Sequence, residues 1–120
     1  MTDDKSTGFG TVSPLDTDEK AGISITVENG LVSSAGYDCS PDTYLKQCAE
    51  ALCGVITGMP ALNLFQMNAN AVYYNLEEEL PRNKLYCASM TVTAAKRAAA
   101  DWCRKNGIDV PHPENGCSCY

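Results

Sequence analysis

Seven cysteines are the residues of this 120-residue chain best suited to chemistry, and all of them lie at or beyond Cys39. An odd number of cysteines does not form a closed set of disulfides, and the first residues lack the basic and apolar stretches of a secretory signal. We therefore expect a cytoplasmic protein whose thiols stay reduced. Reduced cysteines bind metals, act as sulfur nucleophiles, or fill a core as small apolar side chains.

Cys39 is the first candidate because it stands between a predicted strand and a predicted helix. Ser40, Pro41 and Asp42 follow it, and these residue types are typical of a helix start. Free amides at a helix N-terminus stabilise negative charge, so the sequence predicts a lowered pKa and a reactive thiolate at Cys39. Cys87 precedes a second helical segment, and the same reasoning extends to it.

The other cysteines fall into two groups. Cys48 and Cys103 lie on apolar helix faces, where core packing is the expected role. Cys53 follows Cys48 by five residues, which places the two thiols on different sides of a helix and excludes a natural chelate. Cys117 and Cys119 form a Cys-x-Cys pair near the C-terminus, for which metal chelation, disulfide exchange and an incidental role all remain open.

Composition excludes several other classes of function. Nine basic against fifteen acidic residues give a formal charge of -6, which disfavours nucleic-acid binding because phosphates require clustered cations. No apolar run approaches the roughly 20 residues of a membrane span. A single histidine and the lack of a glycine-rich phosphate loop argue against a hydrolase triad and a nucleotide site.

The strand before Cys39 belongs to a predicted β-hairpin over residues 23–37. Ile23, Ile25 and Val27 alternate with polar residues, and Asn29-Gly30 is the preferred pair for a tight hairpin turn. Residues 1–20 show little hydrophobic periodicity, and we predict a loosely attached arm there.

Two helices are predicted after the hairpin. Apolar residues recur at helical spacing over 41–55, and an alanine-rich segment over 93–102 has high helix propensity, with Gly107 in the position of a C-terminal cap. For residues 61–75 the sequence does not distinguish a strand from a helix. The acidic residues 77–79 indicate the end of a short helix. The order of a hairpin followed by helices indicates an α+β fold.

Three stretches of the sequence resemble the NifU/IscU family of iron–sulfur cluster assembly scaffolds. The first runs from Ile23 to Cys39 and ends in Gly36-Tyr37-Asp38-Cys39, where the family has a Tyr-Gly-Cys-like motif before a helix. The second is the segment Glu78-Glu79-Leu80-Pro81-Arg82-Asn83-Lys84-Leu85-Tyr86-Cys87, which is similar to the family's Leu-Pro-Pro-x-Lys loop leading into His-Cys. The third is the alanine-rich helix that follows this cysteine.

The resemblance implies an IscU/SufE-like fold, which is a small antiparallel three-stranded sheet with helices packed on one face. It divides the chain into an arm over 1–20, a domain over 21–107 and a Cys-x-Cys tail over 108–120. It implies that Cys39 and Cys87 hold a [2Fe–2S] cluster or iron, with zinc as an alternative metal in the same site. The family's first cysteine has no counterpart in this chain, and Tyr86 replaces the histidine that usually precedes the third cysteine.

A [2Fe–2S] cluster takes about four ligands, normally thiolates, so two are missing. Cys117 and Cys119 folding back, Glu19, or a second subunit of a homodimer are the candidate sources. The resemblance further implies a cysteine desulfurase as the sulfur donor and apoproteins as the acceptors of the finished cluster.

Three functions follow from these observations. The first is a non-catalytic scaffold that assembles a cluster from iron and sulfide and transfers it. The second is a SufE-like sulfur acceptor in which Cys39 carries a persulfide, which the loss of the first family cysteine favours. The third is a zinc-binding or redox-regulatory module, such as the cysteine-rich domains appended to some ribonucleotide reductases.

Overall fold

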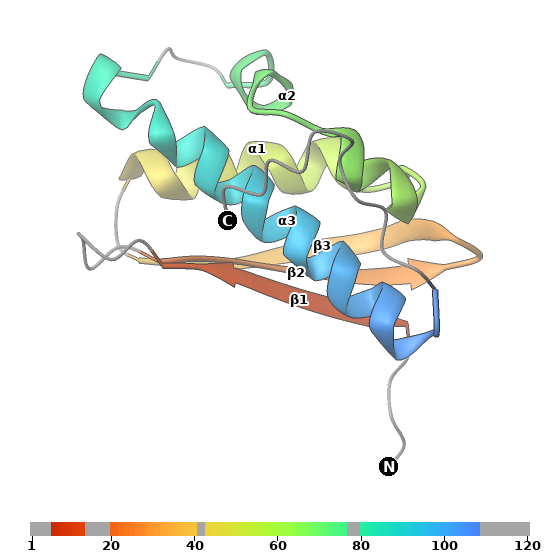
Figure 1. Ribbon diagram of the computed structural model, residues 1–120. Coiled ribbons are helices and arrows are strands. Elements are labelled where there is room, and N and C mark those ends of the chain that lie inside the picture. The colour runs from red at the N-terminus through yellow and green to blue at the C-terminus, as the bar shows by residue number, and fades with distance from the viewer. Residues whose placement is uncertain (1–5, 14–19, 41–42, 77–79, 109–120) are drawn as a thin grey trace.

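The computed structural model describes residues 6–13, 20–40, 43–76 and 80–108. Three strands come first along the chain: β1 (Thr7–Val12), β2 (Ala21–Glu28) and β3 (Leu31–Cys39). They form one antiparallel sheet in the order β1-β2-β3. The helical elements follow and are α1 (Thr43–Ile56), the 3-10 helix η1 (Ala61–Gln66), α2 (Asn70–Tyr73), the 3-10 helix η2 (Arg82–Lys84) and α3 (Tyr86–Lys105). The helices pack on one face of the sheet, so the predicted α+β fold is confirmed (Figure 1).

The turn between β2 and β3 confirms the predicted hairpin. Asn29 and Gly30 have φ angles of 57° and 82°, so both residues occupy the left-handed region that a tight hairpin turn requires. Asparagine tolerates this region better than most residues, and glycine enters it without a Cβ penalty. The turn places Val27 opposite Val32, and an irregularity between Thr26 and Val27 then shifts the pairing by one residue, so that Ala21 pairs with Cys39.

β1 lies within the stretch for which the sequence predicts no regular structure, and that prediction is wrong for residues 7–12. The strand shows no alternating hydrophobic pattern in the sequence, because two of its three buried positions are the glycines Gly8 and Gly10. Val12 is the third buried position. A Cβ added at Gly8 would collide with the backbone of Ala98, and one at Gly10 would collide with the backbone of Ala94. The glycines are needed because α3 lies directly against this strand.

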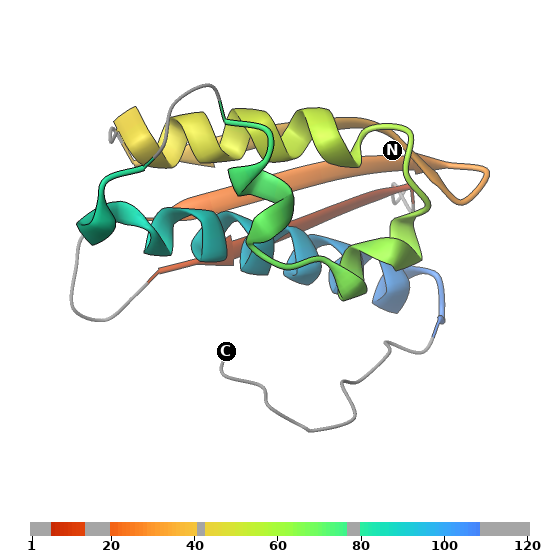
Figure 2. The same ribbon diagram turned by 90° about the horizontal axis from the view of Figure 1, so that it is seen from above.

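α1 and α3 bury one face each against the sheet (Figure 2). The predicted helices are confirmed, although α1 begins at Thr43 and α3 already begins at Tyr86. The stretch 61–75 contains the short helices η1 and α2. Cys48 and Cys103 are buried, as predicted. Among the described residues, no helix has both the length and the apolar character needed to cross a membrane.

The C-terminus of α3 is capped as the sequence predicts. Gly107 has a φ of 69°, and its N–H donates to the carbonyl of Arg104 at 3.3 Å. The N–H of Ile108 donates to the carbonyl of Cys103 at 2.9 Å. This pair of bonds is the usual end of a helix at a left-handed glycine, and it fixes where the chain leaves α3.

Candidate functional site

One end of the molecule gathers the chain segments that carry Cys39 and Cys87. Strand pairing joins Val12 to Ala21 and Ala21 to Cys39, so the end of β1, the start of β2 and the end of β3 lie side by side. α1 begins at this end, because only a short connection separates it from β3. We call this end of the molecule the thiol end.

α3 also begins at the thiol end. Gly8 of β1 lies against Ala98, and Gly10, farther along the strand, lies against Ala94. α3 therefore runs antiparallel to β1, and its first turn, which contains Cys87, lies toward the thiol end and above the sheet (Figure 1). The fold thus brings two cysteines that are remote in the sequence to the same end of the molecule.

Cys39 is half-buried at the end of β3. Burial raises the pKa of its thiol, a backbone hydrogen bond from Gly22 lowers it, and the charge of Asp38 raises it further. The net direction is upward, so the prediction of a lowered pKa from a helix N-terminus is wrong. The physical reason is that α1 begins only at Thr43, four residues later, so that loss of water outweighs the helix amides at the sulfur.

Cys87 is the second residue of α3 and is 0% exposed. Its side chain belongs to the continuous core that also contains Ala88, Leu45 and Leu52. Cys39 and Cys87 therefore share the thiol end but differ in access to solvent. Cys39 is partly exposed to solvent, whereas Cys87 is fully buried.

Cys53 of α1 is a thiol that the sequence analysis did not connect with Cys39. It is half-buried, and its pKa is raised to about 11 by burial first, then by the charges of Cys39 and Glu50. Because the charge of Cys39 raises the pKa of Cys53, the two thiols lie close enough to interact electrostatically. The spacing of Glu50 and Cys53 could have indicated this, since residues three apart lie on the same face of a helix. That face of α1 is the one that packs near β3.

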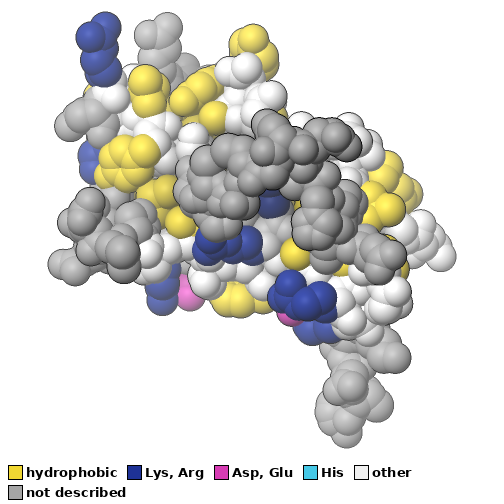
Figure 3. Space-filling view, in the orientation of Figure 1, with side chains coloured by type: hydrophobic (Ala, Val, Ile, Leu, Met, Phe, Trp, Pro, Cys, Tyr) yellow, Lys and Arg dark blue, Asp and Glu magenta, His cyan; other side chains and the backbone are white. Residues whose placement is uncertain are grey.

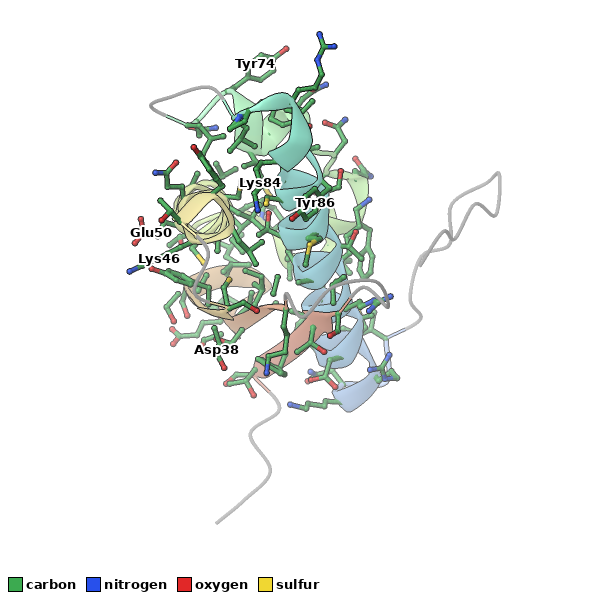
Figure 4. All side chains as sticks on the ribbon, turned by 90° about the vertical axis from the view of Figure 1, so that its left-hand side faces the viewer. Asp38, Lys46, Glu50, Tyr74, Lys84 and Tyr86 are labelled. Atoms are coloured by element: carbon green, nitrogen blue, oxygen red, sulfur yellow. The ribbon has the colours of Figure 1, made fainter. Side chains whose placement is uncertain are left out.

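A hydrogen bond joins β3 to α1 between these thiols. The hydroxyl of Tyr37 donates to Oε2 of Glu50 at 2.7 Å. This bond, followed by burial and by the charges of Glu50, Cys39 and Cys53, raises the pKa of Tyr37 to about 12. Tyr37 and Cys39 are alternate residues of one strand and share its helix-facing side. We call Tyr37, Cys39, Glu50 and Cys53 the β3–α1 cluster. Figure 4 shows Glu50 beside Lys46 on α1, with Asp38 near the sheet.

The start of α3 adds exposed aromatic surface to the thiol end. Lys84 Nζ lies 5.8 Å from the centre of the Tyr86 ring, and Tyr86 itself is 38% exposed. Tyr74 and Leu85 are exposed as well, and hydrophobic side chains gather over α2 and the start of α3 in the space-filling view (Figure 3). Tyr86, which stands where the resembling family has histidine, is therefore a surface residue beside a buried Cys87.

Only part of the predicted set of metal ligands lies within the described residues. In residues 6–13, 20–40, 43–76 and 80–108, no three histidine, cysteine, aspartate or glutamate side chains are grouped so that they could hold a metal ion. Glu19, Cys117 and Cys119 lie outside the described residues. The source of further ligands to Cys39 and Cys87 stays a prediction.

No protein-family model matches the chain, and no curated protein is similar enough in sequence to count as a relative. The resemblance to the NifU/IscU family therefore depends on the three motifs of the sequence. The geometry of the thiol end supplies a separate basis for proposing a function.

The raised pKa of Cys53 predicts how fast this thiol is alkylated at each pH. Only the thiolate reacts, so the rate of carbamidomethylation at Cys53 should rise up to about pH 11 rather than level off near 9.0. Since the folded state holds the proton more tightly, the free energy of unfolding should fall as the pH rises from 9.0 to about 11. Peptide mass spectrometry after timed alkylation measures the rate.

Cys39→Ser is the control for this profile. It removes a charge that raises the pKa of Cys53, so the profile should move to lower pH without returning to 9.0, because burial remains the larger cause. A half-maximal rate near pH 9 in the unaltered protein would contradict the structure of this cluster.

Proposed function

We propose that the protein is a scaffold for iron–sulfur cluster assembly, which holds iron and sulfide through Cys39 and Cys87 and passes the cluster to acceptor proteins. The observation that supports the proposal is that β3 and α3 carry Cys39 and Cys87 toward the same end of the fold, where Cys39 is partly exposed. Iron and the cluster are cargo in this function. A cysteine desulfurase supplies the sulfur, and the reaction takes place in the reducing cytoplasm.

Cys39 is the entry point for the cargo. Its raised pKa keeps the thiol protonated at neutral pH, so iron binding releases a proton and strengthens as the pH rises. The protonated thiol also protects the empty protein, because oxidation and alkylation act on the thiolate. A protonated thiol of this kind binds iron when iron is present, and it resists oxidation and alkylation when iron is absent.

Cys87 becomes a ligand when the first turn of α3 opens. α3 begins at Tyr86, its N-cap residue Leu85 makes no side-chain hydrogen bond, and its first turn carries no acidic residue. The ends of a helix open more readily than its interior. In the proposed scaffold, a movement of the helix start that carries Tyr86 and Cys87 exposes the second thiol.

A SufE-like sulfur acceptor is the second candidate, and the full burial of Cys87 favours it. One accessible thiol suffices for this function. The Cys39 thiolate attacks the terminal sulfur of a donor persulfide, a new S–S bond forms at Cys39, the donor's S–S bond breaks, and the donor leaves as a thiolate. Cys87 then has a packing role only.

Reconstitution of the full chain separates these functions. The protein is incubated without oxygen with ferrous iron, cysteine and a catalytic cysteine desulfurase, and is then freed of small molecules. A scaffold retains iron and acid-labile sulfide in equal amounts and gains visible absorbance. A sulfur acceptor retains no iron, and mass spectrometry finds one additional sulfur atom on the Cys39 peptide. Retention of zinc in place of iron, with unfolding when zinc is removed, would overturn both in favour of a structural zinc module.

A further inference from the structure

The outer edge of β3 is already paired at its start, at the end of the strand remote from Cys39. The N–H of Val32 donates to the carbonyl of Met59 at 2.9 Å, and the N–H of Gly58 donates to the carbonyl of Val32 at 2.7 Å. A short segment that follows α1 thus adds to the first residues of this edge. The edge therefore accepts a further chain segment where one is within reach.

The second half of β3 presents outward peptide groups as far as Cys39. The N–H of Ser40 donates to the carbonyl of Lys20 at 2.9 Å, which fixes the alternation of hydrogen-bonded pairs between β2 and β3. The peptide groups of Ala35, Tyr37 and Cys39 therefore point away from β2. In the part of the chain that the structure describes, no backbone hydrogen bond reaches these outward groups.

The other edge of the sheet is covered by α3. The N–H of Phe9 donates to Asp101 at 3.1 Å, and Arg97 donates to the carbonyl of Thr11 at 2.7 Å. Side chains of α3 thus occupy outward groups of β1, which is one way in which proteins protect an edge strand. Among the described residues, no side chain covers the second half of β3 in this way, so the sheet can extend at the edge that carries Cys39.

The side chains of β3 indicate what kind of strand this edge accepts. Edge strands usually carry charges that prevent pairing, but residues 31–37 have none. Asp38 is the one charged residue of β3, and it is exposed. It lies on the sheet face opposite to the helices, since its neighbours Tyr37 and Cys39 face α1. A cation on an added strand beside Asp38 would form a favourable cross-strand pair. The edge therefore fits an extended segment that is uncharged apart from one basic residue.

A second copy of this protein does not fit the edge. Antiparallel pairing of two β3 strands would place both α1 helices on the same face, over strands about 4.8 Å apart. α1 packs chiefly against β3, and helix axes need about 8–10 Å between them. A single extended segment of a partner protein, without a helix layer of its own at this place, meets no such obstacle.

We propose that the sulfur donor binds as a fourth strand on the outer edge of β3, through an extended segment with a basic residue beside Asp38. The inference rests on the proposed function, because delivery of sulfur to Cys39 is what requires this partner. Facing residues of paired strands lie about 4.5–5.5 Å apart, so a donor cysteine opposite Cys39 comes within reach of its sulfur. The Cys39 thiolate then takes the terminal sulfur of the donor persulfide, the donor's S–S bond breaks, and the donor cysteine leaves as a thiolate.

Amide hydrogen exchange of the full chain, measured by NMR in reducing buffer without metal, tests the docking. The probe is a capped peptide of alternating valine and threonine with one central lysine. With this peptide bound, the N–H groups of Ala35, Tyr37 and Cys39 should exchange about tenfold more slowly than in the protein alone. The N–H groups of Gly36 and Asp38, which face β2, are internal controls and should not change. The same peptide with alternate backbone amides methylated cannot form the ladder and should give no protection.

Two further measurements test the charge and the identity of the partner. The lysine peptide should bind about fivefold more tightly than a peptide with glutamate in its place, and Asp38→Asn should abolish this difference. The lysine peptide should also slow the transfer of sulfur from a cysteine desulfurase to Cys39, followed by mass spectrometry, whereas the methylated peptide should not.

Three outcomes would overturn the proposal. Equal exchange of the three amides with and without the lysine peptide would show that the edge accepts no strand. Protection that grows with protein concentration before any peptide is added would assign the edge to a second copy. Docking of the peptide with an unchanged rate of sulfur transfer would show that the donor binds elsewhere. If the peptide docks but Cys39 receives no sulfur from the desulfurase when the peptide is absent, the proposed function fails and the strand-binding edge stands.

Discussion

Replacing Gly10 by alanine is expected to lower the free energy of unfolding by about 3 kcal/mol. The added Cβ would collide with the carbonyl of Ala94, the amide of Ala98 and the Cβ of Arg97. Two of these atoms belong to the helix backbone, so a side-chain rotation cannot relieve the contact and α3 must move off β1. Urea unfolding followed by circular dichroism measures the loss.

Gly54→Ala is the matched control for Gly10→Ala. Gly54 is an exposed residue inside α1, and no atom lies within 4 Å of a Cβ built on it. Alanine is the better helix former there, so this variant should gain about 0.5–1 kcal/mol. Equal stability of the Gly10→Ala variant and the unaltered protein would contradict the close approach of α3 and β1. That approach also sets where the first turn of α3, with Cys87, lies at the thiol end.

Cys39→Ser is expected to reduce the iron and sulfide retained after reconstitution to background. Serine offers no thiolate, and Cys39 is the half-buried thiol at the end of β3 through which the cargo enters in the proposed function. Iron, acid-labile sulfide and the visible absorbance of the desalted protein are the measurements. Cys103→Ala is the control, since Cys103 is buried near the far end of α3 and should leave retention unchanged.

The variant Cys87→Ser distinguishes the two candidate functions when iron, acid-labile sulfide and the Cys39 persulfide are measured in it. For a scaffold, loss of this thiol should strongly reduce retained iron and sulfide. For a sulfur acceptor, the Cys39 persulfide should form as in the unaltered protein. Retention of iron and sulfide by the Cys39→Ser variant would contradict both functions, because each requires this thiol.

Local sequence determined much of the fold. The Asn29-Gly30 turn, the helix over 43–56 and the glycine end of α3 depend on residues close together in the chain, where backbone preference and periodicity act. The position of Cys39 at a strand end followed from the same local signals. β1 escaped the sequence analysis because its buried positions are glycines, and glycine carries no hydrophobic signal.

The properties of the site were decided by tertiary structure. The pKa of Cys39 rises because burial by distant segments removes water from the sulfur, an effect that the neighbouring residues in the chain do not encode. The nearness of Cys53 to Cys39, the burial of Cys87, and the contrast between a covered β1 edge and an open β3 edge arise from the way α1 and α3 cross the sheet. Residue types and short spacings fix which groups the chain offers, whereas packing between distant segments fixes their exposure and neighbours, because desolvation and charge act through space.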